Sequence, residues 1–256
     1  MLWSKKKNER EPRIILGMVM LEDCIPIDKD ALCQDLIENY DLRPEELSEN
    51  DPALTFTLNG ELVALVFIPM AIPSGDIEDT AEYAYNWPTA ADDLKEHQAH
   101  ILVSIVKGGD DQVERFRIFS QLICSILRTT NSVGVYKGNQ SLLIPRPDYL
   151  EAADVIQKGG LPLNLWIYIG LRHVDGLNSG YTYGLKEFKK KELEIIDSHK
   201  SPDEIREFLF NISYYVLEND IEFEDGQTCG LSETDKIPIT RSAGELVEGE
   251  TFKLGY

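Results

Sequence analysis

Two pairs of side chains in the last third of the chain could carry out acid–base chemistry. Glu192 and Glu194 are two residues apart, so on a strand their carboxylates share one face and could bind a cation or share a proton. His173 is followed by Asp175, a carboxylate that could orient the imidazole as a general base. Because aliphatic residues alternate with the two glutamates, a solvated outer face is the simpler interpretation of that pair.

The remaining histidines and the cysteines form no recognisable constellation. His97 and His100 have a spacing that two metal ligands on a helix could use, but His100 begins an expected strand. We therefore expect a solvated His97 and a His100 ring satisfied by nearby backbone, and we predict no metal and no cofactor. The cysteines lack a close pairing, which favours free thiols in a reducing, cytoplasmic compartment. They are Cys24, Cys33, Cys124 and Cys229.

Charge limits the classes of partner. The chain of 256 residues has a net charge of −20, and both halves are acidic. Such a field opposes nucleic acid and anionic membranes and favours proteins with a basic surface. Tyrosines that alternate along a strand could stack on bases, but such sites also need a basic groove. The candidate partner-binding residues are Asp175, Tyr181, Tyr183, Glu187, Glu192 and Glu194.

The first part of the chain predicts a strand–helix–strand–strand–helix–strand order. A strand at residues 13–21 precedes a helix capped by Asp28. Asn59-Gly60 then separates two apolar runs and is a strong hairpin signal. A helix over 76–87 and a strand over 100–106 complete the βαββαβ order of a ferredoxin-like fold.

The second part of the chain predicts a smaller unit. Apolar residues at helical spacing indicate a long helix over 110–130, and the break at 158–162 is typical of a linker. After it come three expected strands and a helix that opens at Ser201 with Pro and Glu in capping positions. We predict an α+β protein with a mobile terminus (1–10), a ferredoxin-like domain with extra helices (11–158) and a second domain (161–256) with a small antiparallel sheet and one helix.

A set of motifs in the second domain resembles a bacterial family catalogued as domain of unknown function 4261. The motifs are Trp166 to Leu171, Gly180 to Phe188, Glu192 to Ile195 and Asp225-Gly226 with Thr228. Lys189 to Lys191 depart from the resemblance, because members often have a glycine turn there. The family has no assigned catalytic residues, so the resemblance implies none here. It is similar at a distance to immunity proteins encoded beside bacterial toxins.

These observations favour a non-enzymatic acidic protein, an immunity protein or inhibitor that neutralises a toxin by contact. The toxin would have a basic surface, as nucleases do, and would be encoded by a neighbouring gene. The alternative is a hydrolase or small-ligand-binding enzyme that uses a cleft between the two domains. A third hypothesis is a module that self-associates, and the sequence leaves the oligomeric state open.

Overall fold

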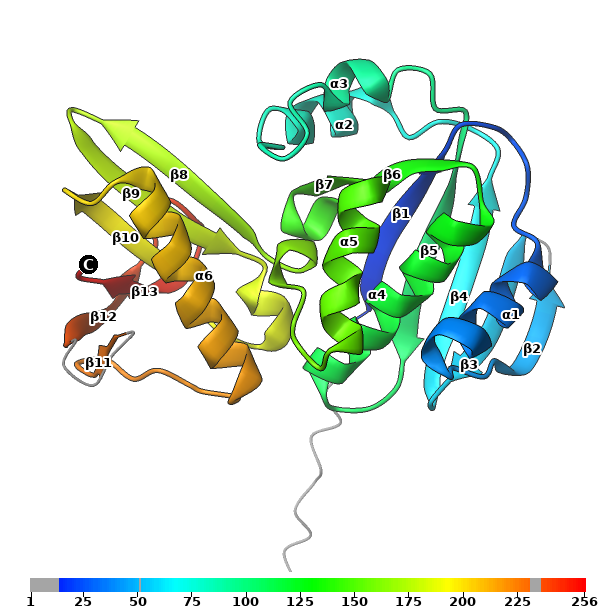
Figure 1. Cartoon of the computed structure of the whole chain (residues 1–256). Coiled ribbons are helices and arrows are strands. Elements are labelled where there is room, and N and C mark those ends of the chain that lie inside the picture. The colour runs from blue at the N-terminus through cyan, green and yellow to red at the C-terminus, as the bar shows by residue number, and fades with distance from the viewer. Residues whose placement is uncertain (1–13, 51, 231–235) are drawn as a thin grey trace, which may run out of the picture.

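A computed structural model describes residues 14–50, 52–230 and 236–256 and contains two β-sheets with helices packed on them (Figure 1). This confirms the α+β class. The predicted mobile terminus lies outside the described residues. The first sheet has seven strands in the order β2-β3-β4-β5-β1-β6-β7. They are β1 (Ile15–Leu21), β2 (Glu45–Asn50), β3 (Ala53–Leu58), β4 (Glu61–Ile68), β5 (Ala99–Lys107), β6 (Ser132–Lys137) and β7 (Leu142–Pro145).

The strand order of the first sheet is not ferredoxin-like. In that fold the first strand lies beside the third, which here would pair β1 with β4. Instead β5 lies between them and pairs antiparallel with both. The ferredoxin-like interpretation followed the order of elements along the chain, which does not determine pairing. Two strands that it lacked, β2 and β6, extend the sheet in opposite directions.

The helices of this half lie on both faces of the sheet. Helices α1 (Lys29–Tyr40), α4 (Gln112–Thr129) and α5 (Arg146–Gln157) contact one another in sequence and cover one face (Figure 1). Helices α2 (Ser74–Ala81) and α3 (Ala90–Asp93) cover Met20 of β1 and Leu143 of β7 on the other. The predicted helix over 76–87 thus ends early, because the following turns bring Trp87 onto this second face.

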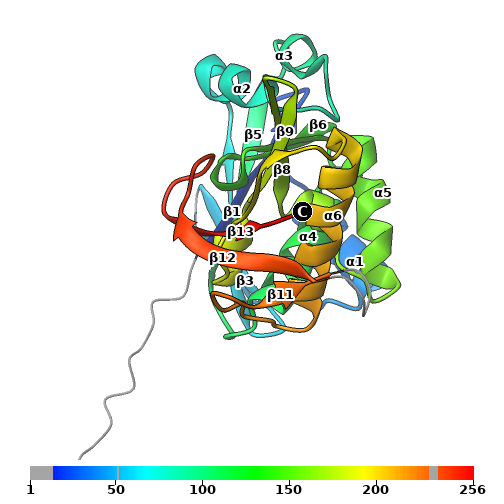
Figure 2. The ribbon, with the colours of Figure 1, turned by 90° about the vertical axis from the view of Figure 1, so that its left-hand side faces the viewer.

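The second sheet has six strands in the order β11-β12-β13-β10-β9-β8, and Figure 2 views the molecule from its side. It is not purely antiparallel, since β10 and β13 pair in parallel. Helix α6 (Pro202–Glu218) packs on β8 and β9 and begins with the predicted capping box of Ser201 and Glu204. The strands are β8 (Tyr168–Val174), β9 (Leu177–Tyr183), β10 (Leu193–Ser198), β11 (Thr228–Cys229), β12 (Ile237–Ala243) and β13 (Glu250–Leu254).

Three 3₁₀ turns complete the described elements: η1 (Gly138–Gln140), η2 (Leu163–Leu165) and η3 (Leu185–Phe188). Aromatic side chains in or next to two of these turns pack against α4. The rings of Trp166, after η2, and Phe188, in η3, lie 5.8 and 4.4 Å from the ring of Phe116 on α4. The Trp166 indole also donates a 2.9 Å hydrogen bond to Ser120 Oγ. The hydrophobic core is therefore continuous across residues 158–161, and the division into two domains there stays a prediction.

A buried lysine crosses the same junction. Lys137 of β6 is 1% exposed, and its Nζ donates to the carbonyl oxygen of Leu165 at 2.8 Å. Burial lowers the pKa of Lys137 to about 7.

None of the helices in the described ranges has the length and apolar character that a membrane span requires.

Candidate functional site: two buried glutamates and a lysine loop

The two glutamates that the sequence suggested as a surface pair are both buried. Glu192 is 6% exposed and Glu194 is 0% exposed, so the solvated outer face predicted for them is wrong. Their neighbours Leu193 and Ile195 are buried as well. This part of the sheet is thus covered on both faces, and strand alternation tells only which residues share a face.

Glu192 holds the turn that follows β9. Its carboxylate accepts four hydrogen bonds, three of them from consecutive backbone amides. The donors are Gly184 N (2.8 Å), Lys186 N (3.1 Å), Leu185 N (3.2 Å) and Thr182 Oγ1 (2.8 Å). These amides begin η3 and would otherwise lack partners inside the protein. The carboxylate therefore caps η3 from outside its own sequence.

Glycine is required where this turn begins. Gly184 has φ 129°, a value that other residues rarely adopt, and a Cβ there would lie 2.7 Å from the carbonyl oxygen of Trp166. The turn thus depends on the Glu192 carboxylate, which accepts from its amides, and on Gly184, which has no side chain.

Glu194 holds a second loop in the same way. Residues 244–249, here termed the β12–β13 loop, direct three consecutive amides at its Oε1. The donors are Glu245 N (3.1 Å), Leu246 N (2.6 Å) and Val247 N (3.1 Å). Its Oε2 accepts from Thr251 Oγ1 at 2.7 Å and from the ammonium of Lys253. Glu194 thus combines a backbone cap with a buried ion pair.

The pKa values of the two carboxyls move in opposite directions. Burial raises the pKa of Glu192, although its four hydrogen bonds favour the charged form. Burial also opposes ionisation of Glu194, but the Lys253 ammonium and the amide and hydroxyl donors outweigh it and lower the pKa. Each carboxylate is saturated with donors from the protein, so the arrangement is structural and leaves no free pair for catalysis.

The turn held by Glu192 carries a concentration of lysines. Residues 186–191, here termed the lysine loop, contain Lys186, Lys189, Lys190 and Lys191, four of the 25 basic residues of an acidic chain. Lys189 adopts the left-handed region with φ 63°, where glycine is favoured.

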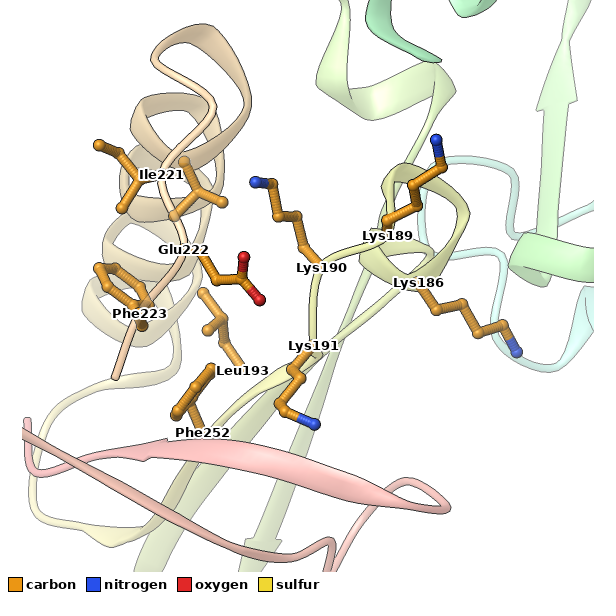
Figure 3. A pocket seen from close by; sticks show the side chains of 10 residues that line it. Lys186, Lys189, Lys190, Lys191, Leu193, Ile221, Glu222, Phe223 and Phe252 are labelled. Carbon is orange, nitrogen blue, oxygen red and sulfur yellow. The ribbon is translucent and has the colours of Figure 1, made fainter. Parts of the chain in front are cut away.

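The four lysines line a cavity of about 300 Å³ (Figure 3). Its wall opposite the loop is the segment that follows α6, and apolar side chains form its inner surface. Figure 3 shows the carboxylate of Glu222 between Lys190 and Lys191, whereas Lys186 and Lys189 point away from it. The apolar lining residues are Leu193, Val216, Ile221, Phe223 and Phe252.

The lysines nearest Glu222 already have acidic partners. Lys190 Nζ lies 2.7 Å from Asp220 Oδ1, and Lys191 Nζ lies 3.1 Å from Glu250 Oε2. Glu222 itself forms no hydrogen bond or ion pair within the described ranges. The cavity therefore has an apolar interior and a mainly cationic rim.

Comparison with known families identifies the part of the chain that holds these features. Residues 181–255 match the family described as Domain of unknown function (DUF4261). This matched segment contains both glutamates, the lysine loop and the β12–β13 loop. The match begins at Tyr181 and leaves out the motif from Trp166 to Leu171, which the resemblance had included. No curated protein and no solved structure matches the chain.

The tyrosines at the start of the matched segment, Tyr181 and Tyr183, are half-buried. The Tyr181 ring lies across Gly170 of β8, where any Cβ would overlap it, and its centroid is 6.2 Å from that of Tyr168. Lys186 Nζ lies 4.4 Å from the ring centroid of Tyr183. Tyr181 thus packs against an aromatic ring of the neighbouring strand, and a partner-binding role for Tyr181 and Tyr183 stays a prediction.

The residues of the alternative catalytic site do not come together. His173 is exposed and its Nδ1 lies 2.7 Å from Asn178 Oδ1, not beside Asp175. The strand register pairs His173 with Asn178, whereas Glu192 binds Thr182 near the other end of β9. At about 3.3 Å per residue these groups are more than 10 Å apart along the strand. Asp175 occupies the exposed β8–β9 turn.

His97 and His100 are structural. The His97 Nε2 accepts from Ile72 N at 2.9 Å and its Nδ1 lies 2.6 Å from the Leu94 carbonyl oxygen, so the predicted solvated ring is wrong. His100 Nδ1 contacts the Met70 carbonyl oxygen at 2.8 Å, as the backbone interpretation expected. Burial lowers the pKa of His100. No group of three or more His, Cys, Asp or Glu side chains in the described ranges is arranged to hold a metal ion.

The structure also gathers acidic side chains that the sequence interpretation had not singled out. Residues 22–50, here termed the acidic edge, contain ten acidic and two basic residues and include α1 and β2. Every residue of β2 is exposed, and β2 is the outermost strand of the first sheet. A count of charge along the sequence could have found this segment. Glu187, by contrast, is half-buried in η3.

Proposed function

We propose that the protein is a non-enzymatic binding protein that neutralises a toxic protein by contact, as an immunity protein or inhibitor does. The acidic edge is the observation that carries this proposal. It concentrates negative charge on an exposed strand and the adjoining helix, where a basic protein surface can reach it.

The side chains of the acidic edge, rather than its backbone, are the contact groups. The pairing of β2 with β3 shifts register between Glu45 and Ser48, and Glu46 there has φ 54°. A bulge and exposed charges on an outer strand discourage the addition of another strand. The partner would therefore dock its lysines and arginines against the carboxylates.

The partner proposed here is a toxin encoded by a neighbouring gene. Nucleases suit this role because they bind nucleic acid through basic surfaces, to which an acidic protein associates rapidly and with strong salt dependence. Both proteins would meet in the cytoplasm. The alternative of a hydrolase site between the two halves has weaker support, since His173 and Asp175 lie away from Glu192 and Glu194.

Co-expression with the product of the adjacent gene, followed by size-exclusion chromatography, tests the proposal. We expect a complex, protection of the host cell, and affinity that falls as salt rises. The double variant Glu38→Lys with Glu45→Lys should weaken the complex by about tenfold or more. Both side chains are exposed on the acidic edge.

A matched control separates the acidic edge from net charge. Glu151→Lys with Asp154→Lys makes the same change in charge on the exposed side of α5. It should weaken the complex much less than the edge variant. Absence of a complex and of protection would remove the proposed function, and equal weakening by both double variants would remove the acidic edge as its site.

A further inference from the structure

The cavity beside the lysine loop combines an apolar inner surface with a rim of lysines. Its inner surface includes Leu193, Phe223 and Phe252, and its rim carries the four lysines. We infer that it binds an organic anion, a carboxylate or phosphate with an alkyl or aryl body. The body would lie on the apolar surface, and the acid group would lie at Lys190 and Lys191.

The balance of charge at the cavity favours an anion. Four lysines and one acidic residue, Glu222, line it, and Figure 3 shows the Glu222 carboxylate between Lys190 and Lys191. Lys190 and Lys191 form ion pairs with Asp220 and Glu250, whose side chains are 95% and 51% exposed to water. A ligand anion can add to these ammonium groups, because each offers three donors. Apolar surface with a few converging charged groups is the usual composition of a small-molecule site.

The backbone of the lysine loop supports a role beyond folding. Lys189 holds a left-handed conformation that is costly for a residue with a side chain, at a position where glycine would be free of strain. Strain of this kind is often retained at binding sites. The backbone amide of Lys189 donates to the Lys186 carbonyl oxygen at 3.0 Å, but the Lys189 ammonium forms no ion pair within the described part of the chain.

The loop is also held in place before any ligand arrives. Glu192 fixes the amides of Gly184, Leu185 and Lys186 from the protein interior. A rim that is already ordered loses less conformational entropy on binding. The buried glutamate therefore acts as a positioning residue for the lysines.

Isothermal titration of the full chain with sodium octanoate, and separately with sodium acetate, tests this inference. Octanoate should bind with 1:1 stoichiometry and at least about tenfold more tightly than acetate, because only octanoate has an apolar body to bury. Lys190→Gln should weaken octanoate binding about tenfold. Lys189→Gly should weaken it about threefold while it raises the thermal midpoint, a combination that a purely structural lysine would not give.

Two further variants make the outcome decisive. Glu222→Gln should tighten octanoate binding, because it removes the one carboxylate that lines the cavity. Lys158→Gln, an exposed lysine on the other half, should leave binding unchanged. Equal affinity for octanoate and acetate, weaker binding by Glu222→Gln, or wild-type binding by Lys190→Gln would each overturn the inference. None of these results bears on the acidic edge or on the proposed toxin partner.

Discussion

The loop held by Glu192 and the loop held by Glu194 are built by the same device with different electrostatics. In each, a buried carboxylate from one short stretch of chain accepts three consecutive backbone amides. Only Glu194 has a cation beside it, Lys253, and only its pKa falls. Hydrogen bonds alone do not offset the burial of Glu192, whose pKa rises. The comparison shows that a carboxylate can hold a loop through three backbone amides while its pKa stays above the ordinary value.

We expect the largest loss of stability when the Lys253 ammonium loses Glu194 as its partner. Glu194→Ala leaves Lys253, whose side chain is 16% exposed, beside three amides without acceptors. Removing one member of a buried ion pair should lower the free energy of unfolding by about 3 to 5 kcal/mol, measured by urea denaturation. Glu248→Ala, exposed on the same loop, should change it by less than about 0.5 kcal/mol. Similar values for the two variants would refute the structural role of Glu194.

Removal of the Glu192 carboxylate should lower the free energy of unfolding by less, because its partners are backbone amides and a hydroxyl rather than an ammonium group. Glu192→Ala leaves its amides without acceptors and should lower the free energy of unfolding by about 2 to 3 kcal/mol. Hydrogen exchange of the amides of residues 184–186 should accelerate more than that of the rest of the sheet. Glu187→Ala in the same turn is the control, with an expected loss below about 1 kcal/mol. Unchanged exchange at 184–186 would contradict the capping role.

The two carboxyls should contribute to acid stability with opposite signs. The lowered pKa of Glu194 adds stability that is present above the ordinary value of 4.5 and is lost as pH falls through the folded-state pKa. The raised pKa of Glu192 lets the folded protein take up a proton first, so stability is gained as pH falls from that pKa toward 4.5.

Urea denaturation from about pH 7 down to about pH 3 measures this difference. The deficit of Glu194→Gln relative to wild type should shrink below about pH 4.5, whereas that of Glu192→Gln should grow as pH falls toward about 4.5. Parallel stability curves for both variants and wild type would show that neither carboxyl changes its pKa on folding.

The smallest expected effect concerns the strained residue beside the Glu192 turn. Lys189→Gly removes a side chain from a left-handed residue and should raise the free energy of unfolding by about 1 kcal/mol. Lys158→Gly is the matched control, because Lys158 has φ −90° and should lose about 0.5 kcal/mol through added flexibility of the unfolded chain. A loss of stability in Lys189→Gly would show that the lysine side chain itself stabilises the turn.

Local signals in the sequence predicted several features correctly because they act over a few residues. Asn59 and Gly60 both adopt positive φ in the β3–β4 hairpin, and Asp28 and Ser201 cap their helices as expected. The long helix predicted over 110–130 forms as α4, where Asp111 accepts from the amides of the first turn. Such groups find their partners within one turn of chain, so no tertiary information is needed.

Features that depend on distant segments were missed for the same reason. The ferredoxin-like order failed because β5 pairs with both β4 and β1, which the order of elements does not specify. The surface role of Glu192 and Glu194 failed because their cover comes from η3 and from a loop more than 50 residues away. The lysine cavity needs the segment after α6 to lie opposite the lysine loop.

The sequence by itself determined the α+β class, the family resemblance, the acidity and the local caps and hairpin. Composition can be counted directly, and caps and hairpin turns depend only on residues close together in the chain. Only the tertiary structure decided which side chains meet water and which meet each other. The buried carboxylates and the cationic cavity arise from segments that are far apart in the chain, and burial and proximity are properties of the packed molecule.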